Sequence, residues 1–297
     1  MKIAHIGNTA GVASTLACEQ RTKGHTVDVF VFDDITEKQF GGTRIKYSRY
    51  SKWLFHRKLE SYDVWHYHYP YGVLKQNLEK RRRYNTYLKH YHGDDLRTVL
   101  KHEDDFCIVA TPDLLKFAPN GKWLPTPIKF EKNGGLSTDN ELTNKIPLVA
   151  HYPYYSIMES HVDYHSKILT RLEKQGKCVV KRIINVSHAI SLKMIASCDI
   201  VVGKIIPEMG WFGKFELEGM SLGKPVITYV SEDLYDMFRP PVCRTTKDTF
   251  EKDLVALINN DYERNRLSRV GLEYIRENHS TKNIVETLEK YYTIKNQ

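Results

Sequence analysis

Two carboxylates stand close together in an otherwise apolar, glycine-rich stretch, GWFGKFELEGMSLGKPVI, at residues 210–227. They are Glu216 and Glu218, and a carboxylate is a strong hydrogen-bond acceptor with two oxygens. The Gly-Lys-Pro at 223–225 ends a helix and leads into a β-branched strand, PVITYV. The stretch therefore predicts a short helix with an inward carboxylate, Glu218. We expect Glu216 on another face of that helix and give it no role.

A second chemistry-bearing stretch is HYHGDDLR at residues 90–97. It follows a strand, and ligands of open α/β sheets bind at the carboxyl ends of strands. His92 could hydrogen-bond a sugar hydroxyl or a phosphate, and Asp94 could accept from a substrate hydroxyl. Alternatively, Asp94 or Asp95 caps a helical turn that runs through Leu100. The two interpretations are compatible, and we predict a functional role for His92.

A third stretch, HIGNTAGVAS at residues 5–14, joins the first strand to the first helix. Glycine allows the chain to turn tightly there, and the N–H groups at a helix start attract anions. We predict phosphate binding by Gly11 and the neighbouring N–H groups. The stretch is not a G-x-G-x-x-G dinucleotide fingerprint, and a plain strand–helix turn is the alternative.

Cysteine and histidine give no metal pattern. The five cysteines are scattered and lack C-x-x-C spacing, which favours reduced thiols in a cytoplasmic protein. The 13 histidines include no H-E-x-x-H motif, so we interpret most of them as surface or hydrogen-bonded residues. We predict no metal site.

Composition is that of a soluble globular protein, with 297 residues, 41% hydrophobic and 27% charged. No apolar run approaches the length of about 20 residues that spans a bilayer, and we see no signal peptide. The net charge is +8, and basic residues gather at 44–58, among aromatic residues, and at 80–83. These runs are solvated faces, or they hold the protein near anionic lipid, nucleic acid or an acidic substrate.

Strand and helix patterns alternate in both halves of the chain, which predicts right-handed βαβ units and parallel sheets. We expect two doubly wound domains facing each other across a cleft. The polar stretch 131–145 is the best linker. The expected domains are 1–140, 146–280 and a terminal helix, 281–297, that packs back on the first domain. The expected strands are 2–7, 25–32, 63–69, 86–93, 105–112, 122–127, 146–153, 178–186, 199–204 and 225–230, and the expected helices are 12–23, 160–175, 188–197, one that holds Glu218, 246–258, 261–277 and 281–294.

The stretch at 210–227 resembles the signature of the family 4 glycosyltransferases, E-x-F-G-x-x-x-x-E-A-M-A-x-G-K-P-V, which have the two-domain GT-B architecture. HYHGDDLR resembles the H-G-S/T-D-I/L-R stretch of one branch of that family, and the region 275–292 resembles its closing helices. Together these resemblances cover most of the chain in order. They imply a retaining, metal-independent glycosyltransferase without a cofactor, whose donor substrate is a nucleotide-diphosphate sugar.

The resemblance implies roles for residues around the predicted helix. Glu218 accepts hydrogen bonds from the ribose hydroxyls of the donor, and glycines allow its backbone to approach. The residues assigned to the donor are Gly11, Gly210, Trp211, Phe212, Gly213, Glu218 and Lys204, and those assigned to catalysis are His92 and Asp94. Catalysis in this family depends on electrostatic stabilisation and positioning.

Two positions depart from the family pattern. In that branch an arginine and a lysine after the first strand of the second domain grip the donor pyrophosphate, and here Ser156 and Glu159 stand in their places. Either another base binds the diphosphate, or the donor differs, or activity is lost. The candidate bases are Lys167, Lys181, Arg182 and Lys204. The first glutamate of the family signature is also replaced, by Gly210.

The leading hypothesis is transfer of a sugar to an unidentified hydroxyl acceptor, a glycan or a lipid-linked molecule, at an anionic membrane surface or in the cytoplasm. One alternative is a degenerate GT-B protein that acts as a binding or partner subunit. Another is a glycosyltransferase that acts on modified DNA. The net charge of +8 is the observation that suggests it.

Overall fold

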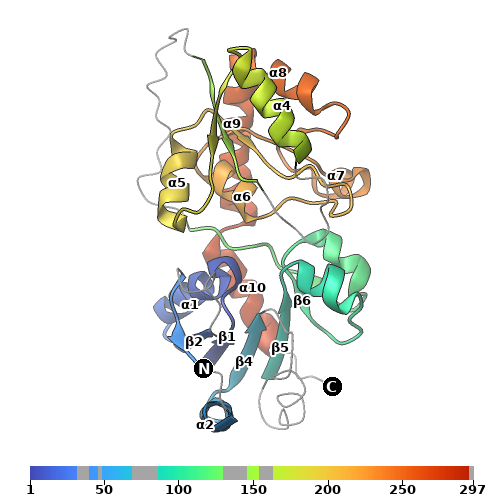
Figure 1. The fold of residues 1–297 in the computed structure, drawn as a ribbon. Coiled ribbons are helices and arrows are strands. Elements are labelled where there is room, and N and C mark those ends of the chain that lie inside the picture. The colour runs from blue at the N-terminus through green and yellow to red at the C-terminus, as the bar shows by residue number, and fades with distance from the viewer. Residues whose placement is uncertain (32–39, 46–48, 69–85, 130–145, 154–162, 294–297) are drawn as a thin grey trace. The chain divides into compact units, whose positions relative to one another are not determined.

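The computed structural model describes residues 1–31, 40–45, 49–68, 86–129, 146–153 and 163–293. The chain divides into two compact units (Figure 1). Unit 1 comprises Met1–Lys129 together with His279–Gln297, and unit 2 comprises Phe130–Asn278. Unit 1 is therefore built from both ends of the chain. The linker expected at 131–145 lies outside the described residues.

Unit 1 contains a parallel sheet in the order β3-β2-β1-β4-β5-β6-β7. The chain order reverses between β1 and β4, which is the switch point where doubly wound sheets bind ligands beyond the carboxyl ends of their strands. The strands are β1 (Lys2–Ile6), β2 (Thr26–Val31), β3 (Thr43–Arg44), β4 (Val64–His68), β5 (Thr86–Tyr91), β6 (Ile108–Val109) and β7 (Lys122–Trp123).

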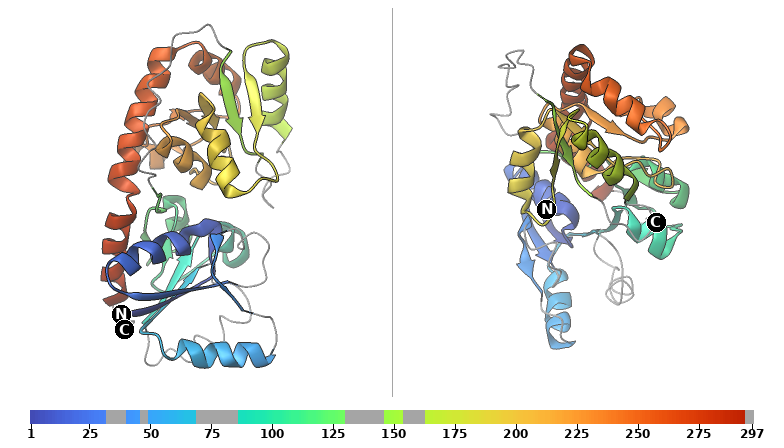
Figure 2. Two further views of the ribbon diagram at one scale, coloured as in Figure 1. Left: turned by 90° about the vertical axis from the view of Figure 1, so that its left-hand side faces the viewer. Right: turned by 45° about the horizontal axis from the view of Figure 1, so that its top comes forward.

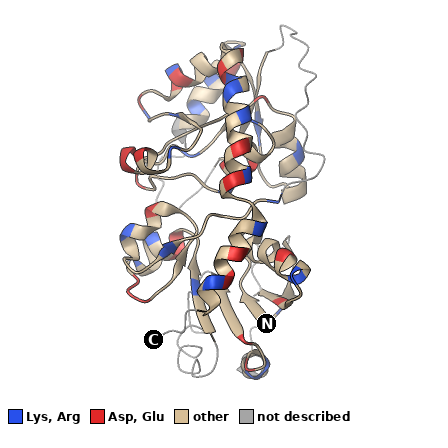
Figure 3. Ribbon diagram, turned by 180° about the vertical axis from the view of Figure 1, so that it is seen from behind, with Lys and Arg blue, Asp and Glu red and all other residues tan. Residues whose placement is uncertain are grey.

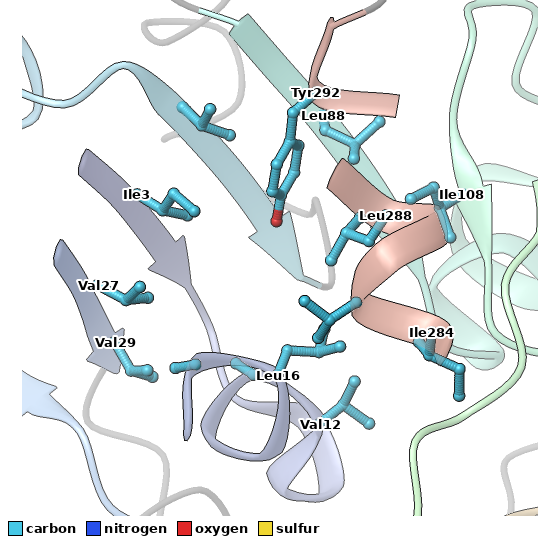
Figure 4. Close-up of a cluster of buried hydrophobic side chains, with 14 of the residues drawn as sticks. Ile3, Val12, Leu16, Val27, Val29, Leu88, Ile108, Ile284, Leu288 and Tyr292 are labelled. Carbon is cyan, nitrogen blue, oxygen red and sulfur yellow. The ribbon is translucent and has the colours of Figure 1, made fainter. Parts of the chain in front are cut away.

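Alternation along the strands gives the unit 1 sheet two buried faces. On one face, side chains such as Ile3 and Leu88 pack under α1 and α10 (Figure 4). On the other face, aromatic residues such as Phe30 and Trp65 pack with Phe55 of α2, which lies on the opposite side of the sheet (Figure 2). The helices of unit 1 are α1 (Val12–Thr22), α2 (Arg49–Leu59) and α10 (Thr281–Thr293), with short helical turns η1 (Thr9–Gly11), η3 (Asp95–Leu100) and η4 (Pro112–Phe117).

Unit 2 contains a second parallel sheet, in the order β12-β11-β10-β8-β9. Its switch point lies between β8 and β10, and α6 follows β10 along the chain. The strands are β8 (Leu148–His151), β9 (Val179–Arg182), β10 (Ile200–Val202), β11 (Val226–Thr228) and β12 (Cys243–Arg244), and the helices are α4 (Asp163–Lys174), α5 (His188–Ala196), α6 (Lys214–Ser221), α7 (Glu232–Phe238), α8 (Phe250–Ile258) and α9 (Asp261–Asn278).

The core of unit 2 joins its sheet to α4, α8 and the start of α9. Gly271 brings α9 close to α6, since a Cβ there would lie 3.3 Å from Met220 Cγ. The outer face of α9 carries basic and acidic residues interspersed (Figure 3), including the ion pairs Arg264–Asp261 and Arg266–Glu263. In the part of the chain that the structure describes, no helix has the length and apolarity needed to cross a membrane.

The prediction of two parallel-sheet α/β domains is confirmed. Among the strands and α-helices, β3, β12, α2 and α7 were not predicted. The basic and aromatic run at 44–58 is largely the helix α2, and its Phe55 and Leu59 belong to the core. The helix α7 also lacked a prediction. The basic run at 80–83 lies outside the described residues.

Candidate functional sites at the carboxyl ends of the two sheets

Glu216 holds the start of α6 in place. Its side chain is fully buried, and its two oxygens accept the N–H of Lys204, at 2.7 Å, and that of Gly213, at 3.0 Å. A carboxylate at a helix start also interacts favourably with the helix dipole. Glu216 lies on another face of α6 than Glu218, as expected, but the expectation that it has no role is wrong. It ties the loop after β10 to the first turn of α6.

Glu218 lies two residues further along α6 and has a different environment. Its Oε1 lies 2.6 Å from Nε2 of His188 and 3.4 Å from Nζ of Lys214, so the carboxylate is held between two bases. His188 is the first residue of α5, where the Ser187 hydroxyl caps the helix by accepting the N–H of Ile190. Within the described residues, the structure records no hydrogen bond to Oε2 of Glu218. That oxygen can accept from a ligand.

Lys204 supplies positive charge at the same helix start. A Cβ on Gly213 would lie 2.9 Å from Nζ of Lys204, so the ammonium group rests against the glycine at the helix start. A side chain at this position would have to move the flexible end of the lysine. The N-terminus of α6 and Lys204 together attract an anion.

The remaining residues of the predicted donor site shape the loop before α6. Gly210 has φ +74°, and its carbonyl accepts the N–H of Ser231. Trp211 and Phe212 are 3% and 1% exposed and stack at 4.6 Å between ring centroids. Their side chains therefore pack in unit 2, and a role in ligand binding would have to use their backbone groups.

The alternative bases of unit 2 have structural partners. Nζ of Lys181 donates to the Ser197 hydroxyl, and Arg182 contacts Glu173 and Thr170. Lys204 is the candidate base that lies at the start of α6. Ser156 and Glu159 lie outside the described residues.

In unit 1, the loop after β5 carries His92 and Asp94, which are both half-buried. Asp95 is buried and accepts the N–H of His92, at 3.0 Å, and that of Gly93, at 2.7 Å. Burial raises the pKa of Asp95 to about 6, although these hydrogen bonds act in the opposite direction. Of the two proposed capping residues, Asp95 thus binds the backbone of the loop, and the side chain of Asp94 caps no N–H of η3.

Arg97 also holds this loop in place. Its guanidinium forms a buried ion pair with Asp113 at 2.7 Å and packs against Gly93, where a Cβ would lie 2.7 Å from NH1 of the arginine. Gly93 also has φ +153°. Three residues of the HYHGDDLR stretch, Gly93, Asp95 and Arg97, therefore fix the backbone that presents His92.

Gly11 forms a tight turn at the end of β1. It has φ +75°, its N–H donates to the carbonyl of Asn8 at 3.1 Å, and a Cβ would meet the Phe40 ring at 2.6 Å. The amide of Asn8 in turn contacts Ser14 and the carbonyls at 40 and 41. The positive φ and the nearby Phe40 ring explain why this position holds glycine. Phosphate binding by this residue stays a prediction.

A cluster of five histidines, of which sequence reasoning singled out only His92, extends along the carboxyl ends of β1, β4 and β5. Alternate positions of neighbouring strands place them on the face that α1 and α10 cover, with His5 beside His66 and His68 beside His90 in register. The repeated H-x-H pattern in VWHYH and KHYH is the signal that could have revealed them. They are His5, His66, His68, His90 and His92.

Ring nitrogens of this cluster lie within 4.8 Å of one another in two groups of three, so a metal site has to be considered. In the structure, the nitrogens are paired with one another instead. The nitrogens of His5 and His68, and of His68 and His92, are hydrogen-bonded at 2.9 and 3.0 Å, which aims each lone pair at a neighbouring ring. Ligands of one ion must instead aim at a common point about 2.0–2.1 Å away.

No protein-family model matches the chain, and no curated protein sequence matches it either. Solved structures do. An α-glucosyltransferase in complex with UDP-glucose and DNA containing an abasic site has a TM-score of 0.66 at 10% identity, covering 99% of both chains. Anabaena Alr3699/HepE in complex with UDP has a TM-score of 0.65 at 13% identity, covering 98% of this chain and 99% of that one.

A third structure, the spinosyn rhamnosyltransferase SpnG complexed with thymidine diphosphate, has a TM-score of 0.57 at 12% identity and covers 97% of this chain and all of that one. These likenesses extend over both units. The chain has the GT-B fold. At such low identity the likeness establishes the architecture alone, and the activity has to be argued from the residues.

Proposed function

We propose that the chain is a retaining, metal-independent glycosyltransferase of family 4 that transfers a sugar from a nucleotide-diphosphate sugar to a hydroxyl acceptor. The observation that carries the proposal is the start of α6, where an accepting carboxylate, a lysine and a helix N-terminus meet beside the switch point of the unit 2 sheet. The structures with UDP, UDP-glucose and thymidine diphosphate support it, because they share this fold.

Each group has a distinct role in the proposed mechanism. Glu218 accepts hydrogen bonds from the ribose diol, while His188 and Lys214 hold its carboxylate in one orientation. Lys204 and the first N–H groups of α6 neutralise the leaving diphosphate. In unit 1, His92 and Asp94 contact hydroxyls of the sugar or the acceptor. The rate enhancement comes from positioning and electrostatic stabilisation.

A thermal-shift screen with UDP, GDP, ADP, CMP and their sugar conjugates tests the donor site. A ligand at about 100 times its dissociation constant adds roughly 2.7 kcal/mol to the free energy of unfolding. We expect one nucleotide to raise the melting temperature of the wild type, and this increase to be much smaller in Glu218→Gln. Glu251→Gln is the matched control, since this exposed glutamate of unit 2 pairs with Arg171 instead.

An equal shift in Glu218→Gln would contradict the ribose assignment, and no shift with any nucleotide would contradict the proposed function. Binding without sugar transfer by the purified protein would favour the degenerate binding subunit.

Transfer to DNA is a second candidate, favoured by the likeness to the α-glucosyltransferase whose structure contains DNA and by the net charge of +8. Binding to duplex DNA should then weaken steeply between 50 and 200 mM salt, because phosphate contacts release counterions. A gel-shift titration measures this, and no binding at low salt would contradict it.

A further inference from the structure

The five histidines of unit 1 belong to one hydrogen-bond chain, which the proposed function does not use beyond His92. We propose that this chain, anchored by Gln20, fixes the proton of His92 on Nε2 and leaves Nδ1 as an acceptor for a substrate hydroxyl. Gln20, His5 and His68 are then positioning residues. The statement about the hydroxyl rests on the proposed function, whereas the statement about the proton rests on unit 1 alone.

The direction of the first branch follows from the amide of Gln20. Its Oε1 can only accept, and it lies 2.7 Å from Nε2 of His5, so that nitrogen carries a proton. A neutral imidazole has one donor and one acceptor, so Nδ1 of His5 accepts from Nε2 of His68, at 2.9 Å. By the same argument Nδ1 of His68 accepts from Nε2 of His92, at 3.0 Å. Nδ1 of His92 is left as an acceptor.

The second branch continues from the other end of the same amide. Nε2 of Gln20 can only donate, and it lies 3.2 Å from the hydroxyl of Tyr292 on α10. That hydroxyl keeps its own proton, which it can donate to Nδ1 of His66 at 2.8 Å. Nε2 of His66 then donates to Nδ1 of His90, at 3.2 Å. Among the described residues, Nε2 of His90 has no partner.

One amide thus sets the proton positions of His5, His68 and His92, and the hydroxyl of Tyr292 passes its orientation on to His66 and His90. If its oxygen and nitrogen exchanged places, every donor in the chain would become an acceptor, and Nδ1 of His92 would become a donor. The chain also needs neutral rings, because an imidazolium has two donors and no acceptor. Burial meets this condition, since it lowers the pKa of His5 to about 4 and that of His92 to about 3.

Burial of the branch explains why water does not replace these bonds. His5, His66 and Gln20 are fully buried, and His68 and His90 are 1% exposed. His92, at the loop after β5, is the half-buried end of the first branch. It is also the residue that the sequence assigns to a hydroxyl. The donor and acceptor roles that are fixed inside the core therefore extend to the surface at His92.

The first test is the tautomer of each histidine in the full-length protein at pH 7, measured by long-range ¹H–¹⁵N correlation on histidine labelled with ¹⁵N. We expect the Nε2–H form for His5, His68 and His92. The Nδ1–H form, an exchanging mixture or a protonated ring at His92 would overturn the proposal. Tight binding of one Zn²⁺ with loss of these N–H signals would overturn it too, because an ion would then replace the protons.

Two variants of the same core separate the branches. Gln20→Met removes the anchor, so His92 should become a mixture of tautomers. Tyr292→Phe cuts only the second branch, so His66 and His90 should change while His92 keeps its Nε2–H form. If His92 responds equally to both variants, or to neither, Gln20 is not the anchor.

The link to substrate is measured with the nucleotide sugar that the thermal-shift screen identifies. In Gln20→Met we expect kcat/KM for transfer or donor hydrolysis to fall about 2- to 10-fold, the factor that one net hydrogen bond carries. An unchanged kcat/KM with a disturbed His92 would overturn the hydroxyl assignment. If no nucleotide sugar binds at all, the proposed function and the hydroxyl assignment fail together, and the tautomer measurement still decides the rest.

Discussion

Two glutamates that stand two residues apart in α6 show how position decides the role of a residue. Glu216 is fully buried and satisfies two backbone N–H groups, whereas Glu218 faces His188 and Lys214 with one oxygen left for a ligand. The sequence assigns Glu218 a ligand role through its resemblance to a family signature, and that role stays a prediction. It did not predict the structural role of Glu216, because that depends on the loop after β10 returning to the helix start.

Replacing Glu216 should cost stability. Glu216→Ala leaves the N–H groups of Lys204 and Gly213 buried without their acceptor, and we expect the free energy of unfolding of unit 2 to fall by about 2–4 kcal/mol. Urea unfolding followed by a unit 2 probe measures this. Glu218→Gln is the comparison and should cost less than about 1 kcal/mol. Equal losses in the two variants would contradict the division of roles.

The role of the histidines in unit 1 also depends on their position, here on the register of neighbouring strands. The sequence suggested surface or hydrogen-bonded histidines, and hydrogen bonding is correct for the cluster in unit 1. What joins them is the register of three strands, and register could not be read from the chain before the strand order was known. The loop residues Gly93 and Arg97 are explained only by the contact between them.

Among the elements, the strands and helices with clear periodicity were predicted well, and short or amphipathic pieces were not. The β-branched strands β2 and β11 lie within their expected ranges. The strand expected at 105–112 is reduced to β6, two residues long, since a turn follows at Pro112. The helix α2 was missed because its aromatic and basic residues resemble a surface.

The helix α10 completes the core of unit 1, and its removal should unfold that unit. Its four buried side chains each contribute about 1.5–3 kcal/mol, so the sum is comparable to the whole stability of a domain. They are Ile284, Val285, Leu288 and Tyr292. We expect a chain that ends at residue 278 to lose amide protection in unit 1 and to retain it in unit 2, whose core contains none of these residues.

Hydrogen exchange followed by mass spectrometry gives this readout. Leu288→Ala is a graded control that should lower the stability of unit 1 by about 2–5 kcal/mol without abolishing its fold. Protection of β1 and β4 in the truncated chain would show that α10 is dispensable.

At the scale of the whole molecule, buried histidines make stability depend on pH. Burial lowers the pKa of His5, His151 and His165 to about 4, so the unfolded chain binds protons first as the pH falls below 6.5. Stability is therefore full above pH 6.5 and is lost between pH 6.5 and about 4, by about 1.4 kcal/mol per pH unit for each neutral histidine.

Urea unfolding at pH 7.5, 6.0 and 5.0 measures this loss. The denaturation midpoint should fall steadily over the series, in both units, since His5 lies in unit 1 and the other two histidines lie in unit 2. A midpoint that does not change between pH 7.5 and 5.0 would mean that these rings are not neutral and buried.

The discontinuous course of unit 1 has a consequence for how the protein is made. During translation, residues 1–129 leave the ribosome long before α10 is synthesised, so the Leu16 and Leu88 side chains wait without the helix that covers them. Unit 2 is continuous and can fold while the ribosome is still producing the last helix. The apolar face of the unit 1 sheet that α10 covers is therefore exposed while about 150 further residues are added. At 5–20 residues per second, this takes about 8–30 seconds. Chaperones that bind nascent chains have that interval in which to act.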